Sequence, residues 1–215
     1  MKVANSKFST KQLTVIALLT AIAYALMVVG RIPMIDFLKY DPKDIVILLS
    51  GMAFGPGVTV LISLITSVIE FMTVSNTGIV GLFMNVLSTV AFATVATIIY
   101  KRKPNHKSLI VGLFMGAILM TLVMVLWNYI VTPFYLQIPR EAVVGMLLPV
   151  IVPFNLIKAG INSGIVFMIY KPILRVFEKH NLIQSNTKSQ KASNYLIAAI
   201  FIISSIIFLF VVRGI

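Results

Sequence analysis

The chain of 215 residues has no cysteine, only two histidines and only six acidic residues. The lack of cysteine excludes disulfides, thiolate nucleophiles and cysteine-ligated metals. Both histidines, His106 and His180, fall in predicted polar loops, which argues against histidine-based metal or triad chemistry. A Walker A sequence and a G-x-S-x-G elbow are also missing, so we expect no ATP hydrolysis by that route and no hydrolase of that type.

What the chain has in abundance is apolar surface. Hydrophobic residues make up 59% of the sequence, charged residues only 11%, and the mean hydropathy is +1.02. This composition is typical of a multi-pass membrane protein, and it predicts an all-α bundle of membrane helices. The net charge of +12 comes from Lys and Arg clustered in short loops. The positive-inside rule explains that clustering better than nucleic-acid binding does.

The apolar runs predict six helices, at residues 13–30, 45–54, 58–74, 79–100, 109–130 and 150–170, the last extending to about 180. The first run is too long for a cleaved signal peptide, so we expect it to be retained. The second is too short to cross ~30 Å of hydrocarbon, so its capped start must lie below the membrane surface. Asp41 is its predicted N-cap, and Asp44 suits the positive end of the helix. Residues 132–149 are expected to form a long connection.

We expect residues 1–180 to form the membrane domain and 181–194 a polar cytoplasmic linker. The apolar run 195–212 is long enough to be a seventh, accessory transmembrane helix within residues 195–215. Placing the N-terminus in the cytoplasm puts most of the 18 Lys and Arg on the cytoplasmic side.

The most informative polar residues lie inside the sixth helix. Asn155, Lys158 and Asn162 are spaced i, i+3, i+7 and therefore share one helix face. A lysine near the middle of a membrane costs about 2.5–3.5 kcal/mol, so Lys158 needs a partner or a ligand.

Polar residues from other segments are expected at the same, outer half of the bundle. They predict a pocket open to the outside, suited to a neutral, carbonyl-rich ring that stacks on nearby aromatic residues. The plainer interpretation is that the asparagines only join neighbouring helices, for about 0.6–2 kcal/mol each, and that Lys158 pairs with Glu70. The contributing residues are Lys39, Tyr40, Asp41, Glu70, Asn85 and Asn128.

Ala17, Ala21 and Ala25 recur at every fourth position of the first helix. Such a stripe allows another helix to approach closely, either within the bundle or from a partner. Spacing alone favours packing within the bundle.

Two motifs resemble the substrate-binding (S) components of energy-coupling-factor (ECF) vitamin transporters. Lys39-Tyr40-Asp41-Pro42-x-Asp44 and Phe154-Asn155-x-Ile157-Lys158-x-Gly160-x-Asn162 are similar to the signatures of the riboflavin-specific members. The alanine stripe and the loop before a short second helix also fit the family. The resemblance covers about residues 10 to 180, and the family pattern ends after the sixth helix, so residues 195–212 depart from it.

The resemblance implies a bacterial plasma-membrane protein that binds riboflavin from outside and needs no cofactor. It also implies as partners a transmembrane coupling subunit and two cytosolic ATPases. Asn155 and Lys158 would then contact the polar edge of the isoalloxazine ring, and the loop at Lys39–Asp41 would help to cover it. Asn128 is a better candidate contact than Glu70, and the alanine stripe would meet the coupling subunit.

Three other functions are weighed against this one. An S component for another vitamin is the nearest alternative. A stand-alone secondary carrier would show inverted repeats, broken helices and midplane acids, and no convincing repeat is present. An intramembrane enzyme would need clustered acids, histidines or a serine with a base, so we expect no enzyme.

Overall fold

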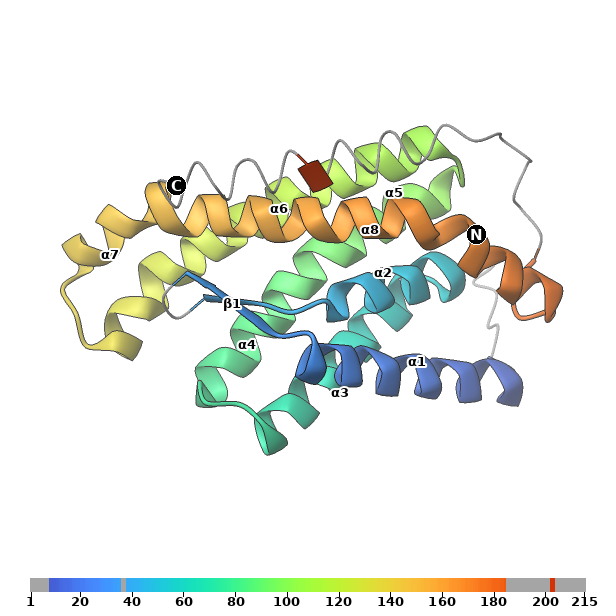
Figure 1. Cartoon of the computed structure of the whole chain (residues 1–215), viewed down its shortest axis with the longest axis horizontal. Coiled ribbons are helices and arrows are strands. Elements are labelled where there is room, and N and C mark those ends of the chain that lie inside the picture. The colour runs from blue at the N-terminus through green and yellow to red at the C-terminus, as the bar shows by residue number, and fades with distance from the viewer. Residues whose placement is uncertain (1–7, 36–37, 185–201, 204–215) are drawn as a thin grey trace, which may run out of the picture.

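The computed structural model describes residues 8–35, 38–184 and 202–203, and over these the chain is a helix bundle with one small hairpin (Figure 1). Five of its helical rods are long and apolar enough to cross a membrane. The predicted all-α membrane fold is therefore confirmed. In chain order the elements are α1 (Thr10–Val29), β1 (Ile32–Ile35), β2 (Leu38–Tyr40), α2 (Lys43–Phe54), α3 (Pro56–Thr73), α4 (Gly78–Thr89), η1 (Val90–Thr94), α5 (Val95–Arg102), α6 (His106–Leu136), α7 (Arg140–Met146), η2 (Leu147–Ile151) and α8 (Val152–Lys179).

The bundle has two chemically different ends. At one end, on the left of Figure 1, lie the β1–β2 hairpin and α7; we call it the hairpin end. At the opposite end the helices finish in cations, and we call it the basic end. The basic end carries Lys11, Lys101, Arg102, Lys103, Lys107, Arg175 and Lys179.

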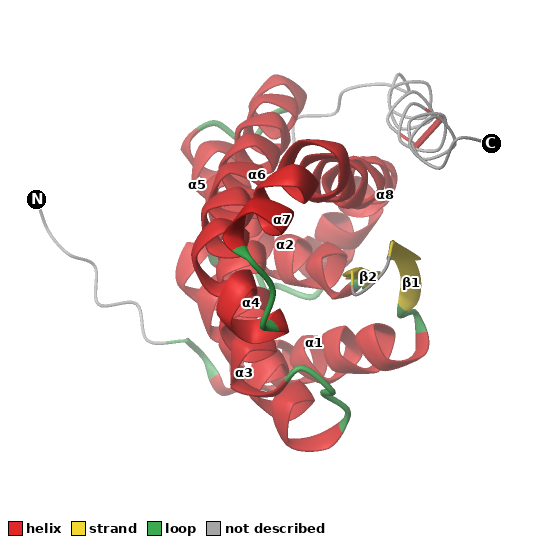
Figure 2. Ribbon diagram, turned by 90° about the vertical axis from the view of Figure 1, so that its left-hand side faces the viewer, coloured by secondary structure: helices red, strands yellow, loops and turns green. Residues whose placement is uncertain are grey.

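Helix α2 occupies the centre of the bundle, as the view along the helices shows (Figure 2). Every residue from Lys43 to Ala53 is buried. Its 12 residues rise only about 18 Å, which confirms the prediction of a helix too short to span a bilayer. Because neighbouring helices enclose it completely, its charged first turn is buried along with its apolar remainder.

The prediction that Asp41 is the N-cap of α2 is wrong. The residue before the helix is Pro42, and no side chain caps the first turn. Asp41 instead contacts Lys43, with 3.1 Å between Oδ1 and Nζ. A buried lysine two residues away is a stronger attraction for this carboxylate than the partial charge of backbone N–H groups.

The hairpin is a feature that the sequence did not predict. Strands β1 and β2 pair antiparallel, with Ile32 opposite Tyr40 and Pro33 opposite Lys39. Both views place the hairpin between α1 and α8 (Figures 1 and 2). Leu38 packs against Ile151 and Phe154, which attaches the hairpin to the start of α8.

The prediction of a long connection at residues 132–149 is also wrong, because most of this segment is helical. Helix α6 continues through Pro133 to Leu136, and α7 leads through the π-turn η2 into α8. In η2 the N–H of Val152 bonds the carbonyl of Leu147 five residues earlier, and Pro149 within this turn has no N–H to give to the carbonyl of Gly145 one turn earlier. In an apolar environment the backbone stays helical across such prolines because exposed peptide groups would be costly.

The seventh segment stays a prediction. Apart from Ile202 and Ile203, residues 195–215 lie outside the described part of the chain, as does the linker beyond residue 184.

Helix α6 approaches the α4–η1–α5 rod very closely at two glycines. A Cβ added to Gly112 would lie 2.9 Å from the carbonyl oxygen of Ala96, and one on Gly116 would lie closer still to that of Phe92. Both neighbours are backbone atoms, so they cannot rotate away. The absence of a side chain at Gly116 is therefore required for the two rods to touch.

We expect Gly116→Ala to lower the free energy of unfolding by about 1–3 kcal/mol, because the helices must separate to admit the methyl group. The measurement is the thermal unfolding temperature in detergent. Gly145→Ala is the matched control, since a Cβ there meets nothing within 4 Å. Equal unfolding temperatures for the two variants would contradict the close approach.

Candidate functional site

A small cavity at the hairpin end collects polar side chains from four elements. Its volume is about 30 Å³. Strand β2 and helices α4, α6 and α8 all contribute to its wall. The lining residues are Leu38, Lys39, Met84, Asn85, Ser88, Met124, Asn128, Phe154, Asn155 and Lys158. Five of the nine residues expected at a binding site therefore lie together: Lys39, Asn85, Asn128, Asn155 and Lys158.

The three asparagines of the cavity are held in place by the protein. Asn128 Nδ2 donates to the carbonyl of Met124 at 2.8 Å, and Asn155 Nδ2 donates to that of Ile151 at 2.8 Å. Asn85 Nδ2 donates to Glu70 Oε2 at 2.7 Å. Asn128 Oδ1 also accepts from Thr132 Oγ1 at 2.8 Å. Each amide has two N–H groups and a carbonyl oxygen, so these bonds orient the three side chains and still leave each of them capacity for a ligand.

Lys158 forms a buried ion pair with Asp44, at 3.2 Å between Nζ and Oδ2. Glu70, the partner that the sequence suggested, is bound elsewhere. Asp44 also accepts a hydrogen bond from Thr89 Oγ1 at 2.7 Å. The sequence prediction did not include Asp44 in the site, because it assigned this residue only to the positive end of the helix dipole in the first turn of α2. The signal that could have found it is the need of a buried lysine for a carboxylate.

Asn162 and Tyr40 join the hairpin to this pair. The Tyr40 hydroxyl donates to Asn162 Oδ1 at 2.9 Å, and Asn162 Nδ2 donates to Asp44 Oδ2 at 3.4 Å. Burial, with a smaller contribution from the charge of Asp44, raises the pKa of Tyr40, so its hydroxyl stays protonated and remains the donor. Both residues lie beside the cavity and outside its lining.

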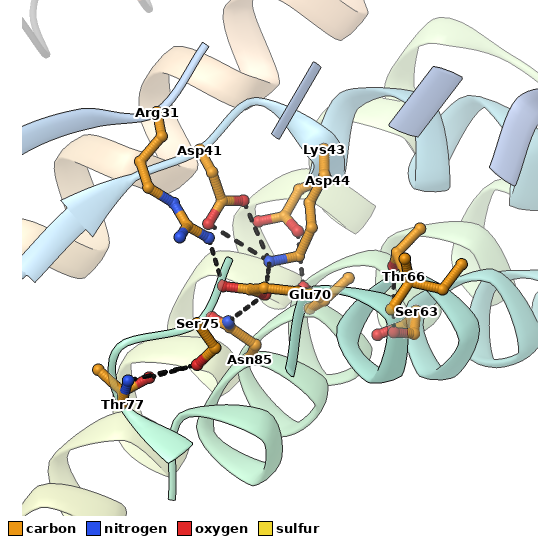
Figure 3. Close-up of polar contacts among 12 residues, drawn as sticks. Arg31, Asp41, Lys43, Asp44, Ser63, Thr66, Glu70, Ser75, Thr77 and Asn85 are labelled. Atoms are coloured by element: carbon orange, nitrogen blue, oxygen red, sulfur yellow. Dashed lines mark hydrogen bonds and ion pairs between the residues drawn. The ribbon is translucent and has the colours of Figure 1, made fainter. Parts of the chain in front are cut away.

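A second network, built on Glu70, lies next to the cavity (Figure 3). Glu70 is paired with Arg31, accepts the hydrogen bond from Asn85, and lies 4.0 Å from Lys43 Nζ. Lys43 in turn pairs with Asp41. Burial favours the neutral form of Asp41, but Lys43 and more distant cations outweigh it and hold the pKa of Asp41 below its usual value. The network thus joins the segment that follows α1 to α2, α3 and α4.

The alanine stripe of α1 faces away from the bundle. Ala17, Ala21 and Ala25 are exposed, whereas the buried face of α1 consists of Ile16, Thr20, Ala23 and Met27. Packing within the bundle, which spacing alone favoured, is therefore wrong for these residues. A smooth surface is left open for another helix.

A larger hollow of about 370 Å³ lies at the basic end, beneath the short helix α2. The wall next to α2 is formed by Met52, Ala53 and Phe54. The polar side chains of the lining include Gln12, Lys101 and Glu178. Lys101 donates to the carbonyl of Ala53 at 3.1 Å. Although it is larger, this hollow has none of the asparagines that converge at the hairpin end, so we place the candidate site there and not here.

Within the described residues, no three His, Cys, Asp or Glu side chains come close enough to hold a metal ion. The candidate site is therefore an arrangement of amides and paired charges. Such groups bind a polar ligand by hydrogen bonds.

The family model of the ECF transporter substrate-specific component matches residues 11–170. The chain belongs to this family. It is 33% identical over 177 residues to the riboflavin transporter RibU of Staphylococcus aureus (strain TCH60), covering 79% of this chain and 93% of that protein. It is also 29% identical over 170 residues to the riboflavin transporter FmnP of Bacillus subtilis (strain 168), covering 73% and 88%.

A solved structure, the S component of a bacterial ECF transporter, has the same fold. The TM-score is 0.67 and the sequence identity 32%, over 78% of this chain and 98% of that one. The resemblance drawn from the two motifs is therefore confirmed.

We expect Lys43→Met to destabilise the protein by about 3–5 kcal/mol, because it leaves Asp41 as a buried charge without its partner. Thermal unfolding in detergent measures the loss. The double variant Asp41→Asn, Lys43→Met should recover part of it, since both charges are then removed. Lys103→Met, at an exposed position of the basic end, is the control. A double variant less stable than Lys43→Met would contradict the pairing.

Proposed function

We propose that this chain is the riboflavin-binding subunit of an ATP-driven ECF vitamin importer. The observation that supports it is the convergence of Lys158, Asn155, Asn128 and Asn85 on one cavity in a chain of the S-component family. The riboflavin named for its curated relatives fits this donor set.

The chemistry of the ligand agrees with the chemistry of the cavity. The isoalloxazine ring is flat and neutral, and its polar edge carries carbonyl oxygens, ring nitrogens and one N–H. Amides offer both donors and acceptors to such an edge, and the Lys158 ammonium offers donors to its oxygens. Because Asp44 balances the charge of Lys158, the site has no need of an anionic ligand.

Ligand binding must widen the cavity. A volume of about 30 Å³ holds little more than a water molecule, whereas sites for drug-sized ligands usually measure about 300–1,000 Å³. Because the hairpin forms part of the cavity wall, we propose that it moves when the ligand enters. It carries Leu38 and Lys39 of the lining and is attached to α8 by the Leu38 packing and the bond from Tyr40 to Asn162.

The distribution of cations supports an orientation with the basic end in the cytoplasm and the candidate site facing outward. The N-terminal end of α1 then lies inside the cell. In keeping with its family, the partners that we propose as its source of energy are a transmembrane coupling subunit and two cytosolic ATPases. The exposed alanine stripe of α1 is the surface that we assign to the coupling subunit.

We expect the detergent-purified protein to bind riboflavin, with quenching of flavin fluorescence and flavin bands in the visible absorption spectrum. Lys158→Ala and Asn155→Ala should each weaken binding about tenfold or more, because each removes a group that the ring edge would otherwise bond. Fluorescence titration measures the dissociation constants.

Lys107→Ala, at the exposed basic end, is the control for general effects of losing a lysine and should bind as the wild type does. A wild-type protein that neither carries nor quenches riboflavin would disprove the proposed ligand. Unchanged affinity in both cavity variants would instead show that riboflavin binds elsewhere, and the hollow at the basic end would then be tested.

We expect Ala21→Leu to bind riboflavin normally yet to lose most uptake, because the added bulk blocks close approach of a partner helix. Uptake of labelled riboflavin in cells carrying the complete transporter measures this. Leu26→Phe adds bulk at an exposed position of α1 outside the stripe and should leave uptake unchanged. Normal uptake by Ala21→Leu would show that the stripe is not the docking surface.

A further inference from the structure

Asp44 is the most enclosed acidic residue near the cavity, at 0% exposure. It begins the central helix α2, and its contacts come from two other helices. Thr89 of α4 donates to one oxygen at 2.7 Å, while Lys158 and Asn162 of α8 approach the other at 3.2 and 3.4 Å. Both oxygens of the carboxylate are therefore engaged, and its position is fixed from two sides.

These contacts determine where the Lys158 ammonium lies. A lysine side chain is a flexible four-carbon stem that does not itself fix the direction of its charge, so an unpaired Lys158 would adopt several positions or withdraw from the cavity. An ammonium has three N–H groups, and one carboxylate oxygen cannot take them all. The pair with Asp44 thus holds the charge at the cavity wall and leaves hydrogens for a ligand.

The other ion pairs near the cavity differ in one respect. Lys43 with Asp41, and Arg31 with Glu70, use cations that are not part of the cavity lining. Asp44 is the carboxylate whose cationic partner also faces the cavity. A purely structural pair would not need that placement.

We propose that Asp44 is a positioning residue of the flavin site, which acts on the ligand through Lys158. This inference rests on the proposed function. Asp44 does not line the cavity, so it affects binding by holding the ammonium in the geometry that a ring edge requires.

The test is a double-mutant cycle of the wild type, Asp44→Asn, Lys158→Met and the double variant. Riboflavin dissociation constants are measured by fluorescence quenching in detergent, with thermal unfolding temperatures measured on the same samples. We expect Asp44→Asn to weaken binding about tenfold or more. In the Lys158→Met background the same substitution should change affinity by less than about twofold, because the residue through which Asp44 acts is gone.

Ser50→Ala is the matched control, since it removes a fully buried polar group of the same helix, whose hydroxyl donates to the carbonyl of Val46. It should bind as the wild type does. Wild-type affinity in Asp44→Asn would overturn the inference. So would a loss of affinity of about tenfold when Asp44→Asn is added to Lys158→Met, because Asp44 would then act on binding through the general structure and not through Lys158.

If Asp44→Asn alone fails to fold, Thr89→Val takes its place, because it removes the hydrogen bond that fixes Asp44 while both charges remain. It should weaken binding in the wild type and have little effect in Lys158→Met, and wild-type affinity in Thr89→Val would overturn the inference. Failure of the wild type to bind riboflavin would refute the proposed function itself, an outcome distinct from either result for Asp44.

Discussion

The structure depends on the compensation of buried charge at the first turn of α2. Lys43 and Asp44 are fully buried in a bundle of largely apolar helices, and neither can remain charged there alone. Their partners come from other segments: Lys158 of α8 binds Asp44, and Asp41, with Glu70 of α3 further off, balances Lys43. The pairs therefore fix the register of the central helix against the helices around it.

This constraint explains why the candidate site lies where it does. A helix of 12 residues cannot carry polar groups to both faces of a bilayer, and α2 has its charges at one end only. The partners that satisfy those charges must gather at the same end, and they bring Asn85, Lys158 and the hairpin with them. The other end of α2 is apolar and finishes above a hollow without the asparagine set.

Much of this could be predicted from the sequence, because membrane helices are defined by length and hydropathy and the spacing of Asn155, Lys158 and Asn162 fixes a shared face. The hairpin, the helical region after Pro133 and the partner of Lys158 could not. Each of these depends on which segments meet in space. Local rules favoured a loop where the hairpin forms and a break in the helix at Pro133. They also assigned Asp44 to the helix dipole. Contacts between distant segments decided all three differently.

The Glu70 network links the cavity to the helix that carries the alanine stripe. One oxygen of Glu70 accepts from Asn85, a lining residue, and the other pairs with Arg31, two residues beyond the end of α1. Since α1 packs mainly on α2 and α3, the balance of charge around Glu70 also bears on how firmly the exposed helix is held.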